Sequence, residues 1–250
     1  MDQTALAASR FGAAATGYLA SAVHAHGADL IRLTEVTHAL NTRAALDVGC
    51  GAGHASFAMA SAGAHVIAYD ISDDMLAVVT KEGAGRGLTA IETRRGPAEK
   101  LPFGDAAFDL VATRFSAHHW RDVPSALAEI RRVLKAGGTL IVIDAVAPED
   151  PLFGTVLQTV ELLRDASHVC DYRISEWIQM FRGAGFTLPL HDRWTLRMEF
   201  DTWIARMHTP EQRVCAIRDV FEHTPEEVQR HFSIGDDDSF DLGVAWLESR

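Results

Sequence analysis

The sequence is poor in cysteine and has no long hydrophobic run. Its three cysteines, Cys50, Cys170 and Cys215, lie far apart among 250 residues, so they indicate neither a disulfide framework nor a structural metal knuckle. This usage fits a reducing compartment, and we expect a cytoplasmic protein. No apolar stretch is long enough to cross a bilayer, and the N-terminal MDQTALAASR lacks the pattern of a signal peptide, so we expect no membrane insertion.

Basic residues are outnumbered as well. The chain has 23 Lys and Arg against 34 Asp and Glu, which gives a formal net charge of −11. Proteins that bind nucleic acids need a basic surface that neutralises phosphates, so we expect no nucleic-acid partner. The hydrophobic content of 48% is ordinary for a globular protein. We expect a single domain over residues 1–250, as a monomer or a homodimer.

Strand-like and helical segments alternate through the middle of the chain. The patterns predict strands at 44–48, 65–71, 91–95, 108–115 and 139–146, and helices at 55–61, 73–82 and 123–134. The last of these strands, TLIVIDAV, is almost entirely apolar, which is typical of a central parallel strand. The alternation predicts an α/β fold with a doubly wound sheet, whose ligands bind at the carboxyl ends of the strands.

The flanking segments are mainly helical. Residues 4–40 are expected to be helical before this core, and residues 151–184 after it, followed by a strand at 186–198 and a last strand at 239–247. Between those two strands, TPEQ (209–212) and TPEE (224–227) each predict a capping box with proline at the first helical position.

The stretch DVGCGAG, Asp47 to Gly53, runs from the end of the first strand into the turn directly after it. Its three glycines leave the backbone open to close approach by a ligand. A dinucleotide loop has the pattern G-x-G-x-x-G, but its third glycine would fall at His54. The glycines instead stand at 49, 51 and 53, behind Asp47, whose carboxylate would disfavour a pyrophosphate and favour an ammonium group. Asp70, at the end of the second strand, can accept ribose hydroxyls of either NAD or S-adenosylmethionine. The pattern favours S-adenosylmethionine, with a nicotinamide-dependent oxidoreductase as the alternative.

Five segments in one order carry a family resemblance. DVGCGAG (47–53), VIAYDIS (66–72), GPAEKLPF (96–103), FDLVATRFSAHHW (108–120) and EIRRVLKAGGTLIVID (129–144) together resemble class I S-adenosylmethionine-dependent methyltransferases. The resemblance is to the methyltransferase type 11 branch, which includes ubiquinone/menaquinone C-methyltransferases. It implies a seven-stranded, mostly parallel Rossmann-like sheet with an N-terminal helical segment and a helical cap, at about 200–232, between the last two strands.

The same resemblance implies a reaction. S-adenosyl-L-methionine would give its methyl group to a carbon, oxygen or nitrogen of a small-molecule acceptor by in-line displacement, leaving S-adenosyl-L-homocysteine. A non-catalytic protein that only binds S-adenosylmethionine is a further alternative. We divide the chain into N-terminal helices (1–40), a cofactor-binding core (41–147) and an acceptor side (148–250).

The family pattern also implies roles for individual residues. The glycine turn would lie against the methionine part, Asp70 would bind the ribose, and Arg114 and Phe115 would lie near the sulfonium. Pro97 stands where many relatives carry an aspartate, so recognition of the adenine edge falls to Glu99 or to a backbone oxygen. The expected cofactor site consists of Tyr18, Asp47, Gly49, Cys50, Gly51, Gly53, Asp70, Ile71, Met75, Ala98, Glu99, Arg114 and Phe115.

Two adjacent histidines follow the fourth predicted strand. One of His118 and His119 is expected to act as a general base or as a donor that orients the acceptor, or else both cap and pack the loop. Adjacent histidines rarely converge on one ion, and we expect no metal. The acceptor pocket is expected to contain His118, Tyr172, Arg173, Trp203 and Arg206, where the arginines would suit an anionic acceptor.

Overall fold

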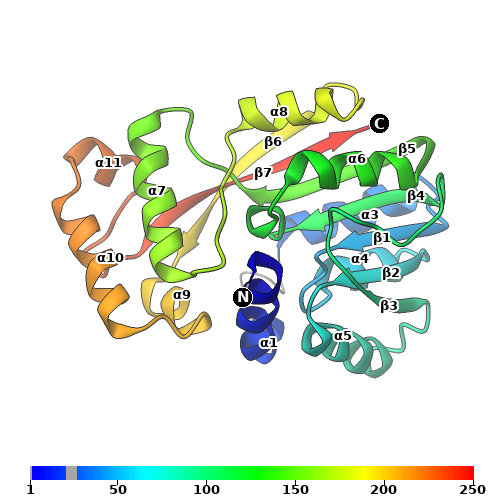
Figure 1. Ribbon diagram of the computed structural model, residues 1–250, viewed down its shortest axis with the longest axis horizontal. Coiled ribbons are helices and arrows are strands. Elements are labelled where there is room, and N and C mark those ends of the chain that lie inside the picture. The colour runs from blue at the N-terminus through cyan, green and yellow to red at the C-terminus, as the bar shows by residue number, and fades with distance from the viewer. Residues whose placement is uncertain (1, 21–26) are drawn as a thin grey trace.

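The centre of the protein is a seven-stranded sheet (Figure 1). The computed structural model describes the backbone of residues 2–20 and 27–250, and the side chains of 2–11 and 27–250. The strand order is β3-β2-β1-β4-β5-β7-β6, with β7 antiparallel to both of its neighbours and the other pairs parallel. This confirms the predicted doubly wound, mostly parallel sheet. The strands are β1 (Ala44–Val48), β2 (His65–Asp70), β3 (Ile91–Arg95), β4 (Phe108–Arg114), β5 (Leu134–Ala145), β6 (Leu190–Met198) and β7 (Phe240–Ser249).

The middle strands are apolar on both faces because helices cover each face. Along β5, Leu140 and Val142 pack into one hydrophobic cluster while Ile141 and Ile143 pack into another, as the two-residue period of a strand requires. The first cluster includes α6 (Val123–Val133) and α8 (Ile174–Gly183), and the second includes α3 (Ala28–Ala39) and α4 (His54–Ser61). Helix α5 (Asp73–Gly85) packs beside α4, through Val79. The strands are therefore fixed in register, and their carboxyl ends form one edge.

Helix α1 (Gln3–Ala20) lies across that edge. It contacts α5 on one side and α9 (Phe200–Arg206) on the other, so it spans the space beyond the strand ends (Figure 1). Arg10 fixes its position by donating a hydrogen bond to the carbonyl of Met207 at 2.7 Å. A short helix, η1 (Ala117–His119), follows β4 at the same edge. Helix α1 therefore closes one side of whatever binds at the strand ends.

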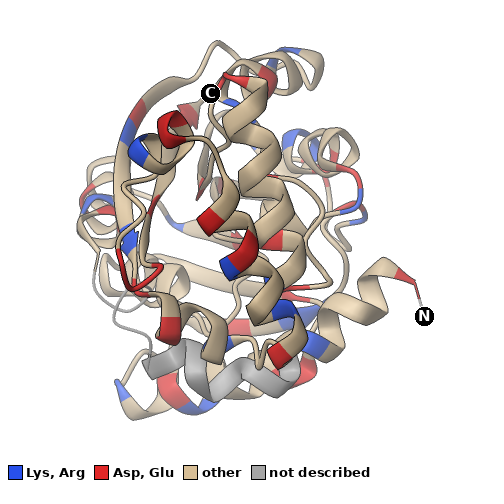
Figure 2. Ribbon diagram, turned by 90° about the vertical axis from the view of Figure 1, so that its left-hand side faces the viewer, with Lys and Arg blue, Asp and Glu red and all other residues tan. Residues whose placement is uncertain are grey.

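The far side of the molecule has its own apolar cluster. Helices α7 (Pro151–Arg164), α10 (Glu211–His223) and α11 (Glu226–His231) pack with α9 around Phe200, Trp203, Phe221 and Phe240. Helices α9 to α11 lie between β6 and β7, which confirms the predicted helical cap. Figure 2 shows acidic and basic residues interspersed on this side. Within residues 2–20 and 27–250, no helix has the length and apolarity that a membrane crossing requires.

The two long helical predictions fared differently. The segment 4–40 contains the helices α1 and α3, with Gly27 as the N-cap of α3, and its residues 21–26 lie outside the described residues. The prediction over 151–184 was wrong in extent. The segment 151–184 is divided because α7 ends at Asp165, whose carboxylate accepts a hydrogen bond from the backbone N–H of Ser167 at 2.9 Å. This local turn competes with helical bonding. The chain then runs without helix to Arg173, the N-cap of α8.

Several predicted helix and strand ends were also wrong. Neither capping box forms: Pro210 and Pro225 occupy the N-cap positions, and the Thr209 hydroxyl donates to the carbonyl of Arg164 instead. Helix α6 ends at Val133, before the glycines, because 134–138 already belong to β5. Helix α5 is capped by Ser72, whose hydroxyl accepts from the N–H of Met75 at 3.3 Å.

Candidate active site

An open cleft of about 1000 Å³ lies at the carboxyl ends of the strands. Four regions of the chain line it: α1, the turn after β1, the end of β2 with the loop after β3, and the segment after β4. Most of the predicted cofactor residues are among the lining residues, namely Asp47, Gly49, Cys50, Gly51, Asp70, Ile71, Met75, Ala98, Glu99, Arg114 and Phe115. The topology therefore brings together residues that are far apart in the sequence.

The glycine turn holds its shape through backbone hydrogen bonds to β2. The N–H groups of Gly49 and Cys50 both donate to the carbonyl of Tyr69, at 2.8 and 3.0 Å. Gly49 has φ +69, and a Cβ there would meet the Ser116 hydroxyl, so the position requires glycine for conformation and for space. Gly51 has φ +49, and a Cβ there would meet no other atom within 4 Å, which leaves its cleft side open.

Asp70 connects the glycine turn to the end of β2. One carboxylate oxygen accepts from the N–H of Gly51 and the other from the N–H of Ser72, each at 2.9 Å. Burial raises the pKa of Asp70, although these two hydrogen bonds act to lower it. Each carboxylate oxygen retains capacity for a further hydrogen bond toward the cleft, because ionised oxygens accept more than one.

Asp47 is a fully buried carboxyl group at the bottom of the cleft. One oxygen accepts from the Ser56 hydroxyl at 2.6 Å, and Oδ1 has no hydrogen-bond partner among the described residues. Burial raises the pKa of Asp47 to about 7, partly offset by Ser56. An unpaired buried oxygen of this kind is costly unless a ligand supplies a donor or a cation.

The segment after β4 forms the wall opposite the glycine turn. The Arg114 guanidinium pairs with the buried carboxylate of Asp29 on α3, which fixes it in place. Phe115 has φ +50, an uncommon value for a large residue, and Arg114 lies over its ring. The Trp120 indole donates to Ser116 at 3.0 Å and is itself in the cleft wall.

His118 is held by Asp144 at the end of β5. Its Nδ1 lies 2.5 Å from one carboxylate oxygen of Asp144, whose other oxygen accepts from the N–H of Ala117. Burial alone would lower the pKa of His118, but the carboxylates of Asp144, Asp171 and Glu161 raise it to about 9. His118 is therefore protonated at neutral pH and donates hydrogen bonds.

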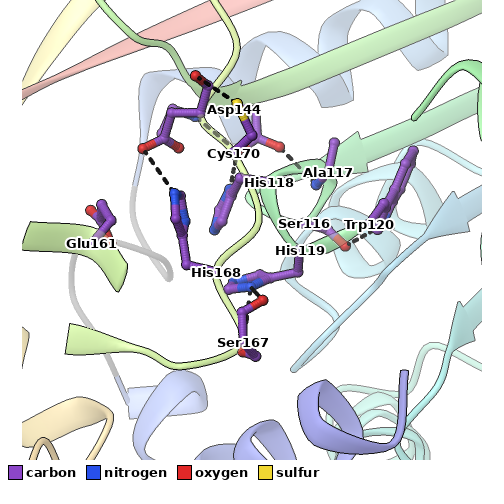
Figure 3. Close-up of polar contacts among 12 residues, drawn as sticks. Ser116, Ala117, His118, His119, Trp120, Asp144, Glu161, Ser167, His168 and Cys170 are labelled. Atoms are coloured by element: carbon purple, nitrogen blue, oxygen red, sulfur yellow. Dashed lines mark hydrogen bonds and ion pairs between the residues drawn. The ribbon is translucent and has the colours of Figure 1, made fainter. Parts of the chain in front are cut away.

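His119 has the opposite character. Its Nδ1–H donates to the carbonyl of Ser167 at 3.1 Å, and its ring contacts Phe11 of α1 with a centroid separation of 4.6 Å. Burial and the charge of His118 lower the pKa of His119 well below its ordinary value. Figure 3 shows these two rings gathered with that of His168, between Glu161 and the Ser116–Trp120 pair. His119 is therefore neutral and weakly basic.

A second cavity, of about 490 Å³, lies behind this wall on the side of the helical cap. Phe115 lines both cavities, whereas His118 lines the second and His119 the first. The remaining walls are about as polar as apolar, with two acidic and two basic residues among them. The lining residues are Phe115, His118, Ala145, Glu161, Arg164, Asp171, Leu196, Met198, Trp203, Arg206 and Leu242.

Known proteins share this arrangement of fold and cleft. Residues 46–142 match the family model of the methyltransferase domain. The Bacillus subtilis protein YcgJ, an uncharacterized methyltransferase, is 34% identical over 212 residues, which cover 85% of this chain and 84% of YcgJ. The chain belongs to the methyltransferase family. The uncharacterized Escherichia coli protein YafE is 42% identical to this methyltransferase over 201 residues, covering 80% of the chain and 97% of YafE.

Solved structures agree with the sequence comparison. The crystal structure of YcgJ superposes on the methyltransferase with a TM-score of 0.81 and 31% identity, covering 87% of this chain and 96% of YcgJ. Demethylmenaquinone methyltransferase of Chlorobaculum parvum is 37% identical, but only over 108 residues, or 43% of each chain. The predicted family is therefore confirmed, and the comparisons support an enzyme that transfers methyl groups over the oxidoreductase and non-catalytic alternatives.

Some predicted site residues of the methyltransferase lie away from the two cavities. Gly53 starts α4, and a Cβ there would meet Phe57 and Val79 in the core. Arg173 is partly exposed and pairs with Glu176 at 2.9 Å, because it caps α8. Tyr172 packs beside Trp177 with a centroid separation of 5.8 Å. Trp203 and Arg206 do line the second cavity. Tyr18 lies in α1, but its side chain is outside the described residues.

Sequence patterns missed several residues that the methyltransferase brings to these cavities. The cleft also contains Gln3, Phe11 and His54, and the second cavity contains Glu161 and Asp171. Gln3 donates to the carbonyl of Ser167 at 2.7 Å, which joins α1 to the loop after α7. None of these residues belongs to a motif with a recognisable spacing. Within the described residues, no group of three or more His, Cys, Asp or Glu side chains has a geometry suited to a metal ion.

Proposed function

We propose that the protein transfers the methyl group of S-adenosylmethionine, bound in the cleft, to a small-molecule acceptor bound in the second cavity. The observation that supports this division is the position of Phe115, which lines both cavities. A donor and an acceptor on its two sides would be close neighbours. Methyl transfer from a sulfonium is an in-line displacement, which needs close approach and alignment more than it needs a catalytic group.

The residues of the cleft fit the cofactor. The unpaired Oδ1 of Asp47 suits the ammonium group of the methionine part, and the open side of Gly51 leaves room for its backbone. Asp70 has acceptor capacity for the ribose hydroxyls, while buried Met75 and Ala98 offer apolar surface to the adenine. When bound, S-adenosylmethionine supplies an activated methyl group on a positively charged sulfur.

The histidines suit a role in positioning. His118 is already protonated at neutral pH, so it donates a hydrogen bond into the second cavity and, with its pKa of about 9, is a base only in alkaline solution. His119 is neutral, but its lowered pKa makes it a weak proton acceptor. We infer that the chain contributes alignment and exclusion of water, and that the acceptor must reach the site with a nucleophilic carbon, oxygen or nitrogen.

Two measurements test this proposal. Calorimetry should show binding of S-adenosylhomocysteine and no binding of NAD or NADP. A screen with a radiolabelled methyl donor, against quinone precursors, phenols, amines and small carboxylic acids, should then reveal label transfer to at least one class. Tighter binding of NAD than of S-adenosylhomocysteine would contradict the assignment of the cleft.

A further inference from the structure

The second cavity contains one buried carboxyl group whose hydrogen bonds are not satisfied. Asp171 is only 2% exposed, and neither of its carboxylate oxygens has a hydrogen-bond partner among the described residues. The backbone around it is well fixed: its N–H donates to Gln158 Oε1 at 3.1 Å, and its carbonyl accepts from Gln158 Nε2 at 2.6 Å. The position of the carboxylate in the cavity wall is therefore a fixed feature of the loop.

The neighbouring histidine does not satisfy this carboxylate. His168 Nε2 lies 3.9 Å from Asp171, beyond hydrogen-bond distance, and the same nitrogen lies 2.7 Å from Gln158 Oε1. Because the amide oxygen can only accept, Nε2 carries the proton and Nδ1 is bare. Burial and the charge of His118 lower the pKa of His168 to about 3, so this ring is neutral. It provides no counter-charge to Asp171.

The other charged residues around the cavity have partners of their own. Glu161 and Arg164 of α7 pair with each other at 3.5 Å, and the Arg164 guanidinium donates to the carbonyl of Trp203 at 3.0 Å. His118 is paired with Asp144. Arg206, on α9, also contributes positive charge to the lining. What the described part of the cavity lacks is a donor within hydrogen-bond distance of the Asp171 carboxylate.

We propose that Asp171 recognises the methyl acceptor by accepting a hydrogen bond from its hydroxyl or ammonium group, an inference that rests on the proposed function. An apolar part of the acceptor would lie against Phe115, Leu196, Met198, Trp203 and Leu242, which supply about half of the surrounding surface. An unsatisfied buried carboxylate destabilises a fold, and such groups persist at sites where a ligand completes them. In this arrangement, the acceptor atom that receives the methyl group lies toward Phe115. The hydroxyl or ammonium group that donates the hydrogen bond lies at Asp171.

Binding of an ammonium group and binding of a hydroxyl group to Asp171 would differ in whether a proton is released. Burial, with the charges of Glu161 and Asp144, raises the pKa of Asp171 to about 8, while His118 and Arg164 act in the opposite direction. The empty cavity therefore favours the protonated form of Asp171. An ammonium group would bind the ionised carboxylate, so the proton of Asp171 would be released to solvent. A hydroxyl group can bind with no net release.

Matched probes on the protein saturated with S-adenosylhomocysteine test the proposal. Benzylamine, benzyl alcohol and benzyl methyl ether share an apolar ring and differ in the donor group. We expect at least one of the two donors to bind about tenfold or more tightly than the ether, as a charge-assisted hydrogen bond provides. Titration in buffers of different ionisation enthalpy then separates the ammonium case, with proton release, from the hydroxyl case.

Two variants locate the effect. Asp171→Leu, which removes both acceptor oxygens, should remove the preference for either donor probe, while Glu161→Gln, which changes a paired carboxylate of the same cavity, should retain it. Equal affinity for all three probes, no binding of either donor, or an unchanged preference in Asp171→Leu would overturn the proposal. Binding of S-adenosylhomocysteine, measured in the same samples, separates this failure from failure of the proposed function.

Discussion

His118 and His119 are adjacent in the chain, yet they line different cavities and have opposite charge states. His118 faces the second cavity as a cation paired with Asp144, and His119 faces the cofactor cleft as a neutral ring bonded to the carbonyl of Ser167. The short helix η1 produces this divergence, because consecutive residues of a tight helical turn point in different directions. Any functional test of one histidine therefore needs the other as its comparison.

The first prediction concerns the charge of His118. His118→Gln should lower turnover roughly tenfold to a hundredfold, the usual effect of losing a charged hydrogen bond, and leave the affinity for S-adenosylhomocysteine unchanged. The wild-type rate should fall as pH rises through about 9, where His118 loses its proton, and the variant should lack this fall. A pH–rate profile of both proteins, with His119→Gln alongside, measures this. A wild-type rate that instead increases up to pH 9 would identify His118 as a base.

Gly51 provides a test of the cleft that does not disturb the core. Gly51→Ala places a methyl group in the open space where we expect the methionine part to bind, so binding of S-adenosylhomocysteine should weaken strongly. The left-handed backbone adds a stability cost of about 1–2 kcal/mol. Gly63→Ala is the matched control, since Gly63 also has a positive φ and open space but lies outside the cleft. Equal calorimetric affinities in the two variants would argue against this position for the ligand.

Asp70 should contribute directly to cofactor affinity. Asp70→Ala removes the acceptors for the ribose and also the bonds to the N–H groups of Gly51 and Ser72, so the dissociation constant of S-adenosylhomocysteine should rise at least tenfold. Circular dichroism should report an unchanged fold. Asp73→Ala, which alters an exposed carboxylate paired with Arg95 nearby, should leave the affinity as it is. An unaltered dissociation constant for Asp70→Ala would separate this residue from the ribose.

Asp171 should make the stability of the empty protein depend on pH. Its pKa in the folded state is raised from 3.8 to about 8, so the fold prefers the protonated form. This contribution is complete at low pH and is lost as pH rises toward 8. The free energy of unfolding of Asp171→Asn, measured with urea, should therefore exceed that of wild type by more at alkaline than at acidic pH.

Asp109 gives a comparison of opposite sign. Burial alone would raise the pKa of Asp109, but hydrogen bonds from Lys135 and from the N–H groups of Ala44 and Arg43 lower it. Its contribution to stability is present above the ordinary pKa of an aspartate and is lost as pH falls through the lowered value. Asp109→Asn should therefore be less stable than wild type at neutral pH, and the difference should shrink in acid. The same pH trend in both variants would contradict the role given to Asp171.

The residues that line the cleft were largely predictable because their signals are local in the sequence. The turn at Gly49–Gly53 and the carboxylate of Asp70 each follow a strand with a clear pattern, and parallel strands bring their ends to one edge. The lining of the second cavity was not predictable in this way. Glu161 comes from a helix and Asp171 from an irregular loop, and packing alone brings the two together. Arg173 resembled a binding residue but caps α8, an outcome decided by Glu176 three positions later.

The boundary at Phe115 also corresponds to a division along the sequence. Apart from Phe115 and His118, every described residue that lines the second cavity lies after residue 142, where the match to the family model ends. Substitutions that change the shape of that chamber need not touch the machinery that holds the methyl donor. A family built in this way can acquire new acceptors through drift in its C-terminal half while it keeps one inherited chemistry, and exchange of that half between relatives is the corresponding route for engineering.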